Sequence, residues 1–195
     1  MSDLLTGKEI IDSSEDISAL EQEHDHGHDH SADAHIWLSP DNAKQMVTNI
    51  CEALCKQYPE HINTFKANRA ALHLEIDALQ TYAQQQLASL PTRELITFHD
   101  GFSYFAEAFD LHILAAVEEE SGSEASAAEL KDLIKLVRGH NLPAVFIERS
   151  GSVSAADIIA AETGVKIYTL DMAMSGDSWI DAMYHNIDTI KEALG

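Results

Sequence analysis

Basic residues are scarce in this chain. Its 195 residues include 12 lysines and arginines against 33 aspartates and glutamates, which gives a formal net charge of -21. Nucleic acids and anionic membrane surfaces attract proteins largely through lysine and arginine, so a deficit of this size argues against both as partners. The same excess of carboxylates favours the attraction of cations, although an acidic surface also serves solubility.

Long hydrophobic runs are absent as well. No stretch of about 18 apolar residues occurs, so the sequence predicts no transmembrane helix. The first eight residues, MSDLLTGK, lack the basic start and the apolar stretch of a secretory signal peptide. The hydrophobic content of 45% is nevertheless ordinary for a globular chain, and the length allows one ample domain, with or without a fragment of a second.

Cysteine is nearly absent, with Cys51 and Cys55 as its two instances. They lie four residues apart in a predicted helix, where their side chains share a face and point in parallel. That arrangement disfavours a disulfide within a regular helix. We interpret both as small buried apolar residues, which says nothing firm about the redox compartment.

Histidine, by contrast, is concentrated near the front of the chain. Residues 21–30 read EQEHDHGHDH, and a further histidine, His35, follows in the string DAHIWLSP at residues 33–40. Neutral imidazole is a favoured ligand of zinc and its transition-metal neighbours, and histidine-rich tracts are typical of metal binding. We therefore predict weak metal sites in this tract, formed by His24, His26, His28 and His30. The alternative is a solvated acidic loop whose histidines are incidental.

The first ninety residues predict a strand, a loop and two helices. Residues 8–12 read as a short strand without a visible partner, and residues 13–34 as a polar loop with one turn at 17–20. Ser39 and Pro40 are typical of a helix start, which predicts a helix over 40–57. Apolar residues at helical spacing predict a second helix over 59–89. At roughly 1.5 Å per residue this helix spans about 45 Å, so it is well placed to act as a strut.

From residue 91 onward, strands and helices alternate. Apolar runs predict strands at 94–98, 112–117, 144–147 and 166–170, and helical patterns predict helices at 101–109, 125–138, 154–163 and 178–194. Alternation with short links indicates a four-stranded parallel sheet with flanking helices, an α/β fold.

Potential metal ligands follow each predicted strand. They are His99, Glu118 with Glu119, Glu148, and Asp171. Ligands of open α/β sheets bind beyond the carboxyl ends of the strands, so these side chains lie where a site is expected. Carboxylates at such positions are weak indicators in an acidic protein. His99 alone reads equally well as a helix-capping or core residue, but together with His35 and the tract it favours a metal site.

At this point the chain resembles a known family, the substrate-binding proteins of zinc and manganese ABC importers. The resemblance runs from about residue 4 to residue 195. It rests on KEIIDSSEDI, the histidine-rich loop, DAHIWLSP, FHDGFSYF at 98–105, FIERS, ETGVKIYTLD at 162–171 and GDSWIDAMYHNI at 176–187. The string DxHIWLSP after a histidine and acid loop is specific, and the other segments match in the same order along the chain.

The resemblance implies two lobes, each with a parallel sheet, joined by one long rigid helix, with the metal between them. The family ligands carry over as His35 from the first lobe and His99 from the second, with Asp171 as a candidate for a further position. The earliest histidine ligand of the family has no counterpart here. We therefore expect residues 1–58 to be a remnant of the first lobe with the histidine-rich loop at 21–34, residues 59–90 the linking helix, and residues 91–195 the second α/β lobe.

The function implied by the resemblance is high-affinity zinc binding and delivery to the membrane permease of an ABC importer. The full-length family member is periplasmic, and its secretory signal would be lost with the missing part. We expect a monomer and no enzymatic activity. Manganese carriers of the family place a carboxylate where this chain has His99, so zinc is expected as the cargo and manganese is the less favoured metal.

Other functions are compatible with parts of the sequence. A histidine-rich zinc buffer or metallochaperone would need only the tract. A zinc hydrolase uses three protein ligands and a water, but no HExxH or similar string is present, and nothing selects a base among Glu118, Glu119 and Glu148. A flavodoxin-like nucleotide-binding domain fits the alternation after residue 91, yet the sequence has neither GxGxxG nor a P-loop.

Overall fold

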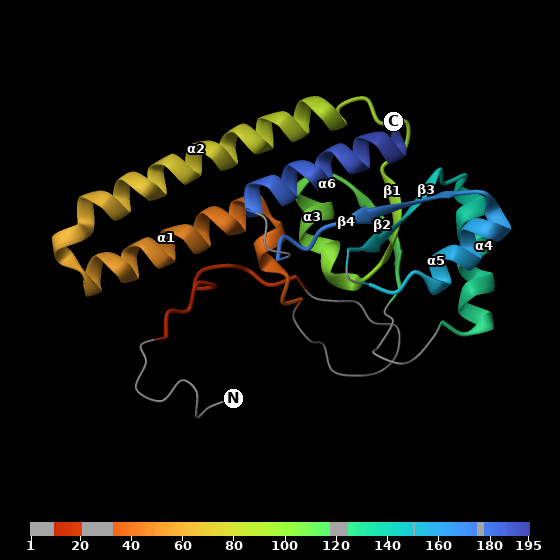
Figure 1. Cartoon of the computed structure of the whole chain (residues 1–195), viewed down its shortest axis with the longest axis horizontal. Helices are drawn as coiled ribbons and strands as arrows, with labels where there is room; N and C mark the ends of the chain where they lie inside the picture. Colours follow the sequence, from red (N-terminus) through yellow and green to blue (C-terminus); the bar gives the residue numbers. More distant parts are fainter. Residues whose placement is uncertain (1–9, 21–32, 118–124, 150, 175–177) are drawn as a thin grey trace.

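The computed structural model of the chain contains one parallel sheet covered by helices on both faces, with a long helical hairpin beside it (Figure 1). It describes residues 10–20, 33–117, 125–149, 151–174 and 178–195. The predicted α/β fold with a four-stranded parallel sheet and flanking helices is confirmed. The division into a first-lobe remnant, a linking helix and a second lobe stays a prediction.

The sheet has the strand order β2-β1-β3-β4, and all of its pairs are parallel. Its strands are β1 (Glu94–Phe98), β2 (His112–Ala116), β3 (Ala144–Glu148) and β4 (Lys166–Leu170). The predicted strands agree with these bounds to within about one residue. Successive side chains point to opposite faces, so Leu95 enters one core and Ile96 the other. The carboxyl ends of β1 and β4 lie at the same edge, and His99 and Asp171 follow them directly.

Helices cover the two faces of the sheet unequally. The helices of this half are α3 (Ser103–Ala108), α4 (Ala127–His140), α5 (Ser154–Thr163) and α6 (Trp179–Leu194). Buried side chains of α3 and α6 share a core with the end of the long helix, whereas those of α4 and α5 form a separate core on the opposite face. The predicted helix over 101–109 is divided between a 3-10 turn, η4 (Asp100–Phe102), and α3, and α4 begins two residues later than predicted.

A helical hairpin extends away from the sheet, as Figure 1 shows in orange and yellow. It consists of α1 (Pro40–Gln57), a 3-10 turn η3 (Pro59–His61) and α2 (Ile62–Leu87). The Ser39 hydroxyl accepts a hydrogen bond from the backbone N–H of Asn42 and caps α1 as predicted. The second helix is shorter than the predicted range of 59–89, because residues 59–61 form a 3-10 turn and α2 ends at Leu87. No helix among the described residues is long and apolar enough to cross a membrane.

The two halves of α2 have different surroundings. Its buried apolar residues lie toward the carboxyl end, and all of them except Ile76 belong to the core that α6 shares. They are Ile76, Leu79, Ala83 and Leu87. The amino-terminal half packs against α1, away from the sheet (Figure 1). The carboxyl half thus anchors the hairpin to the sheet, and the amino half projects from it.

The predicted strand over 8–12 is not found in the described residues. Ile10–Asp12 have no strand, and residues 8 and 9 lie outside the described part of the chain. Asp12 instead accepts hydrogen bonds from the backbone N–H and the hydroxyl of Ser14, which starts a turn over residues 13–16. The predicted turn at 17–20 is therefore displaced by four residues. A strand needs a neighbour to pair with, whereas this segment is held by the Asn49 amide, which donates to two of its carbonyl groups.

Candidate metal site

His35 and His99 come together in the structure, although 64 residues separate them in the chain. Their Nε2 atoms lie 3.4 Å apart, and the ring centroids are 5.1 Å apart with planes inclined by 83°. A tetrahedral zinc ion with Zn–N distances of about 2.0–2.1 Å separates two nitrogen ligands by about 3.3–3.4 Å. The two imidazoles therefore have the spacing of a pair that shares one zinc ion.

Local structure places each ring. His35 precedes a 3-10 turn, η2 (Ile36–Leu38), whose Leu38 side chain is fully buried in the core. His99 directly follows the buried strand β1, at the start of η4. Both rings are half-buried, so each is held by the protein while remaining reachable by an ion.

A buried carboxylate holds the other nitrogen of His35. Asp33 Oδ1 lies 2.8 Å from His35 Nδ1 and also accepts the backbone N–H of His35 at 2.8 Å. The hydrogen bond that the His35 ring donates to Asp33 raises the pKa of His35, whereas burial acts in the opposite direction and lowers it. Burial raises the pKa of Asp33, but the hydrogen bonds from His35 outweigh this effect, so that the pKa is lowered overall.

Two indole rings and one phenol tie this segment to the sheet. Trp37 Nε1 donates to the carbonyl oxygen of Met172, and Trp179 Nε1 donates to the carbonyl oxygen of Trp37, both at 2.8 Å. The Tyr104 hydroxyl donates to the carbonyl oxygen of Asp33 at 3.2 Å. These partners lie on α3, on α6 and just after β4. His35 is thus held against the half of the molecule that carries His99.

The position of the His99 ring depends on a glycine two residues later. A Cβ atom on Gly101 would lie 2.9 Å from His99 Cδ2 and Nε2, and 2.6 Å from Met172 Cε. Cβ atoms do not approach other atoms this closely, so a side chain here would displace the imidazole. Because Gly101 has no side chain, the His99 ring can occupy the position in which it approaches His35.

Asp171 follows β4 as predicted and is 2% exposed. Its Oδ2 accepts a hydrogen bond from Arg149 Nη1 at 2.7 Å, and its Oδ1 accepts the backbone N–H of Ala173 at 2.8 Å. The side chain of Asn186 bonds both backbone groups of Asp171, which fixes the main chain at this point. In the described part of the chain, no group of three or more histidine, cysteine, aspartate or glutamate side chains is arranged to hold a metal ion. The structure thus brings the two histidines together and pairs Asp171 with Arg149.

Several predicted ligands cannot be placed. His24, His26, His28 and His30 of the tract, together with Glu118 and Glu119, lie outside the described residues. Glu148 ends β3 and is half-buried. Sequence reasoning assigned no role to Asp33 or Gly101, although the spacing Asp-x-His at 33–35 and the string His-Asp-Gly at 99–101 offered the signal. The hydrogen bonds of the Trp37 and Trp179 indole N–H groups were not predicted either.

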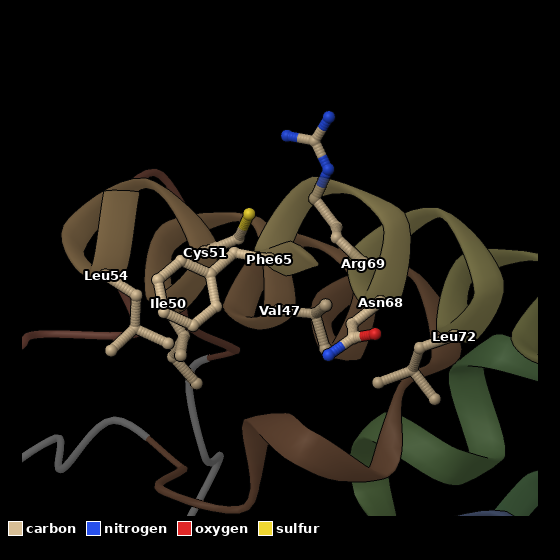
Figure 2. Close-up of a pocket in the computed structure, with 8 residues that line it drawn as sticks. All are labelled: Val47, Ile50, Cys51, Leu54, Phe65, Asn68, Arg69 and Leu72. Atoms are coloured by element: carbon tan, nitrogen blue, oxygen red, sulfur yellow. The ribbon is translucent and has the colours of Figure 1, made fainter. Parts of the chain in front are cut away.

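An apolar groove lies elsewhere, between the outer halves of α1 and α2 (Figure 2). Its volume is about 170 Å³, and its lining is Val47, Ile50, Cys51, Leu54, Phe65, Asn68, Arg69 and Leu72. Figure 2 shows the Arg69 guanidinium pointing away from the apolar side chains. Cys51 offers a single thiol among mostly apolar side chains, and one such group cannot supply the several ligands that a zinc site needs. The histidine pair is therefore the better candidate for metal binding.

Similar proteins point to the same chemistry. The family model described as zinc-uptake complex component A, periplasmic, matches residues 1–193. A putative metal-binding protein of Treponema pallidum is 32% identical over 169 residues, which cover 85% of this chain and 54% of the relative. The zinc-binding lipoprotein AdcA of Streptococcus pneumoniae serotype 4 is 30% identical over 183 residues, which cover 88% of this chain and 36% of the relative. The chain thus spans about half, or less, of the curated relatives it matches.

Solved structures agree with this assignment. A crystal structure of ZnuA is 34% identical with a TM-score of 0.84, and the match covers 95% of this chain and 70% of that one. The Zn(II)-bound ZnuA-like domain of Streptococcus pneumoniae AdcA is 26% identical with a TM-score of 0.77, covering 94% of this chain and 69% of that one. Because the family model matches nearly the whole chain, this protein belongs to the family of periplasmic zinc-uptake complex component A proteins.

Proposed function

We propose that this chain binds a zinc ion as cargo between His35 and His99 and contributes it to uptake through an ABC importer. The observation that carries the proposal is the separation of 3.4 Å between the two Nε2 atoms, which suits two ligands of one tetrahedral ion. The names of the AdcA relatives and the zinc-bound ZnuA-like structure support zinc as the ion.

Asp171 is proposed as a third ligand, which would bind zinc in place of its hydrogen bond with Arg149. Its carboxylate is buried, whereas the Arg149 side chain that it bonds is 50% exposed. Arg149 can therefore turn toward solvent if a cation replaces its charge next to Asp171. Two imidazoles, one carboxylate and a water would complete a tetrahedral zinc site.

The partner and the location follow from the same proposal. A protein that carries zinc to an importer must meet the membrane permease of that importer, and we propose a periplasmic location in line with the family description. We propose a monomer that transports zinc rather than an enzyme. The net charge of -21 suits the capture of a cation and disfavours nucleic acid.

Calorimetric titration with zinc tests the proposal. His35→Ala and His99→Ala should each weaken the tightest site by more than roughly tenfold, about 1.4 kcal/mol, because each removes a nitrogen that the rest of the site cannot replace. His61→Ala is the matched control, since this exposed imidazole lies on η3 and contacts Glu60 and Phe65. Unchanged affinity in both site variants would contradict the proposal.

A zinc buffer is the second function to test, because the tract could bind metal without the pair. Removal of residues 23–30 distinguishes the two functions. Loss of the tightest site on removal of the tract would favour the buffer, whereas its retention would favour the carrier.

A further inference from the structure

We propose that Asp33 is a positioning residue that fixes the tautomer and the orientation of the His35 ring for zinc. This inference rests on the proposed function, since it concerns how the same site is prepared. It assigns Asp33 no direct contact with the metal. Its effect is exerted through the far nitrogen of His35.

The hydrogen bonds of Asp33 set the ring in one orientation. A single oxygen, Oδ1, accepts both from His35 Nδ1 and from the His35 backbone N–H, each at 2.8 Å. The two bonds link the side chain of Asp33 to the ring and the main chain of the same residue, so rotation of the imidazole would break one of them. The His35 ring is held with its Nε2 atom toward His99, and this atom lies 3.4 Å from Nε2 of His99.

The same contact selects the tautomer. An ionised carboxylate is only an acceptor, so Nδ1 of His35 must be the donor. In a neutral imidazole the proton then lies on Nδ1, and the lone pair lies on Nε2, which is the atom that faces His99. A carboxylate behind a metal-binding histidine also raises the basicity of the ligand nitrogen.

The burial of Asp33 indicates a role beyond local structure. The residue is 2% exposed, and its buried Oδ2 atom makes no hydrogen bond of normal geometry in the described part of the chain, although the nearby Ser103 hydroxyl helps to lower the pKa of the carboxyl group. A buried carboxylate with one unsatisfied oxygen is costly unless positive charge lies close by. A cation on Nε2 of His35 would supply such charge through the imidazole.

The main chain of Asp33 is itself held in place. Its carbonyl oxygen accepts the Tyr104 hydroxyl at 3.2 Å, and the same phenol oxygen accepts the backbone N–H of Leu20 at 2.8 Å. Tyr104 lies on α3, which follows His99 after only the short turn η4. Asp33 therefore connects the orientation of His35 to the backbone that carries the second histidine.

Two variants and one control test the inference by competition with a chromogenic zinc chelator. Asp33→Asn keeps the shape and removes the charge, and Asp33→Ala removes the acceptor. Each should weaken zinc binding by about ten- to a hundredfold, with the larger loss in Asp33→Ala. Asp41→Asn removes an equal charge in the first turn of α1, where the carboxylate bonds Gln80, and should leave the affinity unchanged.

A second measurement reads the tautomer directly and needs no zinc. Long-range proton–nitrogen NMR spectra of the metal-free protein, recorded at about pH 9 where imidazole is largely neutral, should show the His35 proton on Nδ1. In Asp33→Ala the Nε2-protonated form should become populated. A proton on Nε2 in the unaltered protein would overturn the inference even if a variant fails to fold.

The outcomes separate this inference from the proposed function. If the unaltered protein binds zinc tightly and both Asp33 variants bind it equally well, the inference fails and the function stands. If the unaltered protein binds no zinc, the function fails, and the tautomer of His35 still decides whether Asp33 orients the ring.

Discussion

The indole Nε1 of Trp37 donates a hydrogen bond to the backbone carbonyl of Met172, which lies 135 residues further along the chain, at 2.8 Å. The indole Nε1 of Trp179 in turn donates a hydrogen bond to the backbone carbonyl of Trp37, also at 2.8 Å. The resemblance to the family assigns His35 to the first lobe. These bonds nevertheless hold it against the sheet that carries His99. Because a preformed pair loses little entropy on binding an ion, the two histidines can form a tight half-site within this chain.

Loosening this contact should weaken zinc binding without removing a ligand. Trp37→Phe keeps an aromatic ring but deletes the donor to Met172, which leaves a buried carbonyl with one bond fewer. We expect the free energy of unfolding to fall by about 1–2 kcal/mol. We also expect a measurable loss of zinc affinity that is smaller than that of His35→Ala. Urea denaturation and zinc titration measure the two effects.

The control for this prediction is Tyr82→Phe. It deletes a hydroxyl that bonds Asp188 at an exposed contact between α2 and α6. Zinc affinity should not change, because neither residue touches the histidine pair. Equal losses of zinc affinity in Trp37→Phe and Tyr82→Phe would show that the indole bond has no specific part in holding His35.

Gly101→Ala should impair zinc binding through His99. A methyl group at this position would meet the imidazole at 2.9 Å, so the ring must move away from His35. We expect a loss of affinity of about tenfold or more, since a displaced nitrogen cannot complete the coordination geometry. Isothermal titration with zinc gives the change in affinity.

Gly139→Ala provides the opposite control. This glycine lies in α4, and nothing stands within 4 Å of an added Cβ. Alanine is the better helix former, so the free energy of unfolding should rise by about 0.5–1 kcal/mol while zinc affinity stays constant. A Gly101→Ala variant that binds zinc as tightly as Gly139→Ala would contradict the steric role of Gly101.

The Asp33–His35 pair should give the metal-free protein a pH-dependent stability. The pKa of His35 is raised above its usual 6.5, so its contribution is complete below the unfolded pKa and is lost as the pH rises through the folded pKa. The pKa of Asp33 is lowered below 3.8, so its contribution is lost as the pH falls through that lower value. The pair therefore stabilises the fold most between about pH 3.8 and pH 6.5, the ordinary pKa values of the two groups.

Thermal unfolding of His35→Gln measures this effect. The decrease in Tm relative to the unaltered protein should be larger near about pH 6 than near about pH 9. His61→Gln, at an exposed position remote from the pair, is the control and should show no such dependence. A decrease in Tm that is constant across this range would exclude a stabilising ion pair.

The sheet and the two candidate histidines were predictable because their signals are local, whereas the pairing of these histidines was implied by the resemblance to the family. Apolar runs bounded by turn residues gave the strands, and Ser39 with Pro40 gave the start of α1. His99 was found because a parallel sheet gathers the residues that follow its strands at one edge. His35 was found from the density of histidine and the DxHIWLSP string.

The remaining features depend on contacts between distant segments. The strand predicted over 8–12 was not found for residues 10–12, because pairing requires a neighbour that sequence alone does not supply. The bond between Arg149 and Asp171 joins the ends of two strands, and nothing in either strand indicates that pairing. Asp33 was overlooked because a residue that supports a ligand has no spacing rule of its own.

The histidine tract should add zinc capacity without tight binding. His24, His26, His28 and His30 lie outside the described residues, so the expectation rests on composition. Ordering such a segment around an ion costs entropy for each residue held, which keeps these sites weak. Removal of residues 23–30 should lower the zinc stoichiometry in a calorimetric titration and leave the tightest site nearly unchanged. An unchanged stoichiometry would show that the tract binds no zinc under those conditions.

The final prediction concerns the choice of metal. His35 and His99 offer two imidazole nitrogens, which zinc binds more strongly than manganese does, whereas manganese prefers hard oxygen ligands. We expect zinc to be preferred by on the order of a hundredfold or more. Competition titration at neutral pH with elemental analysis measures this ratio, at one fixed pH because ligand protonation changes both affinities. His99→Glu replaces a nitrogen by a carboxylate and should narrow the gap, while His61→Glu, which adds an equal charge at an exposed and remote position, should not. Manganese retained by the unaltered protein at equal zinc would contradict the preference, because the nitrogen pair could not then be the dominant ligand set.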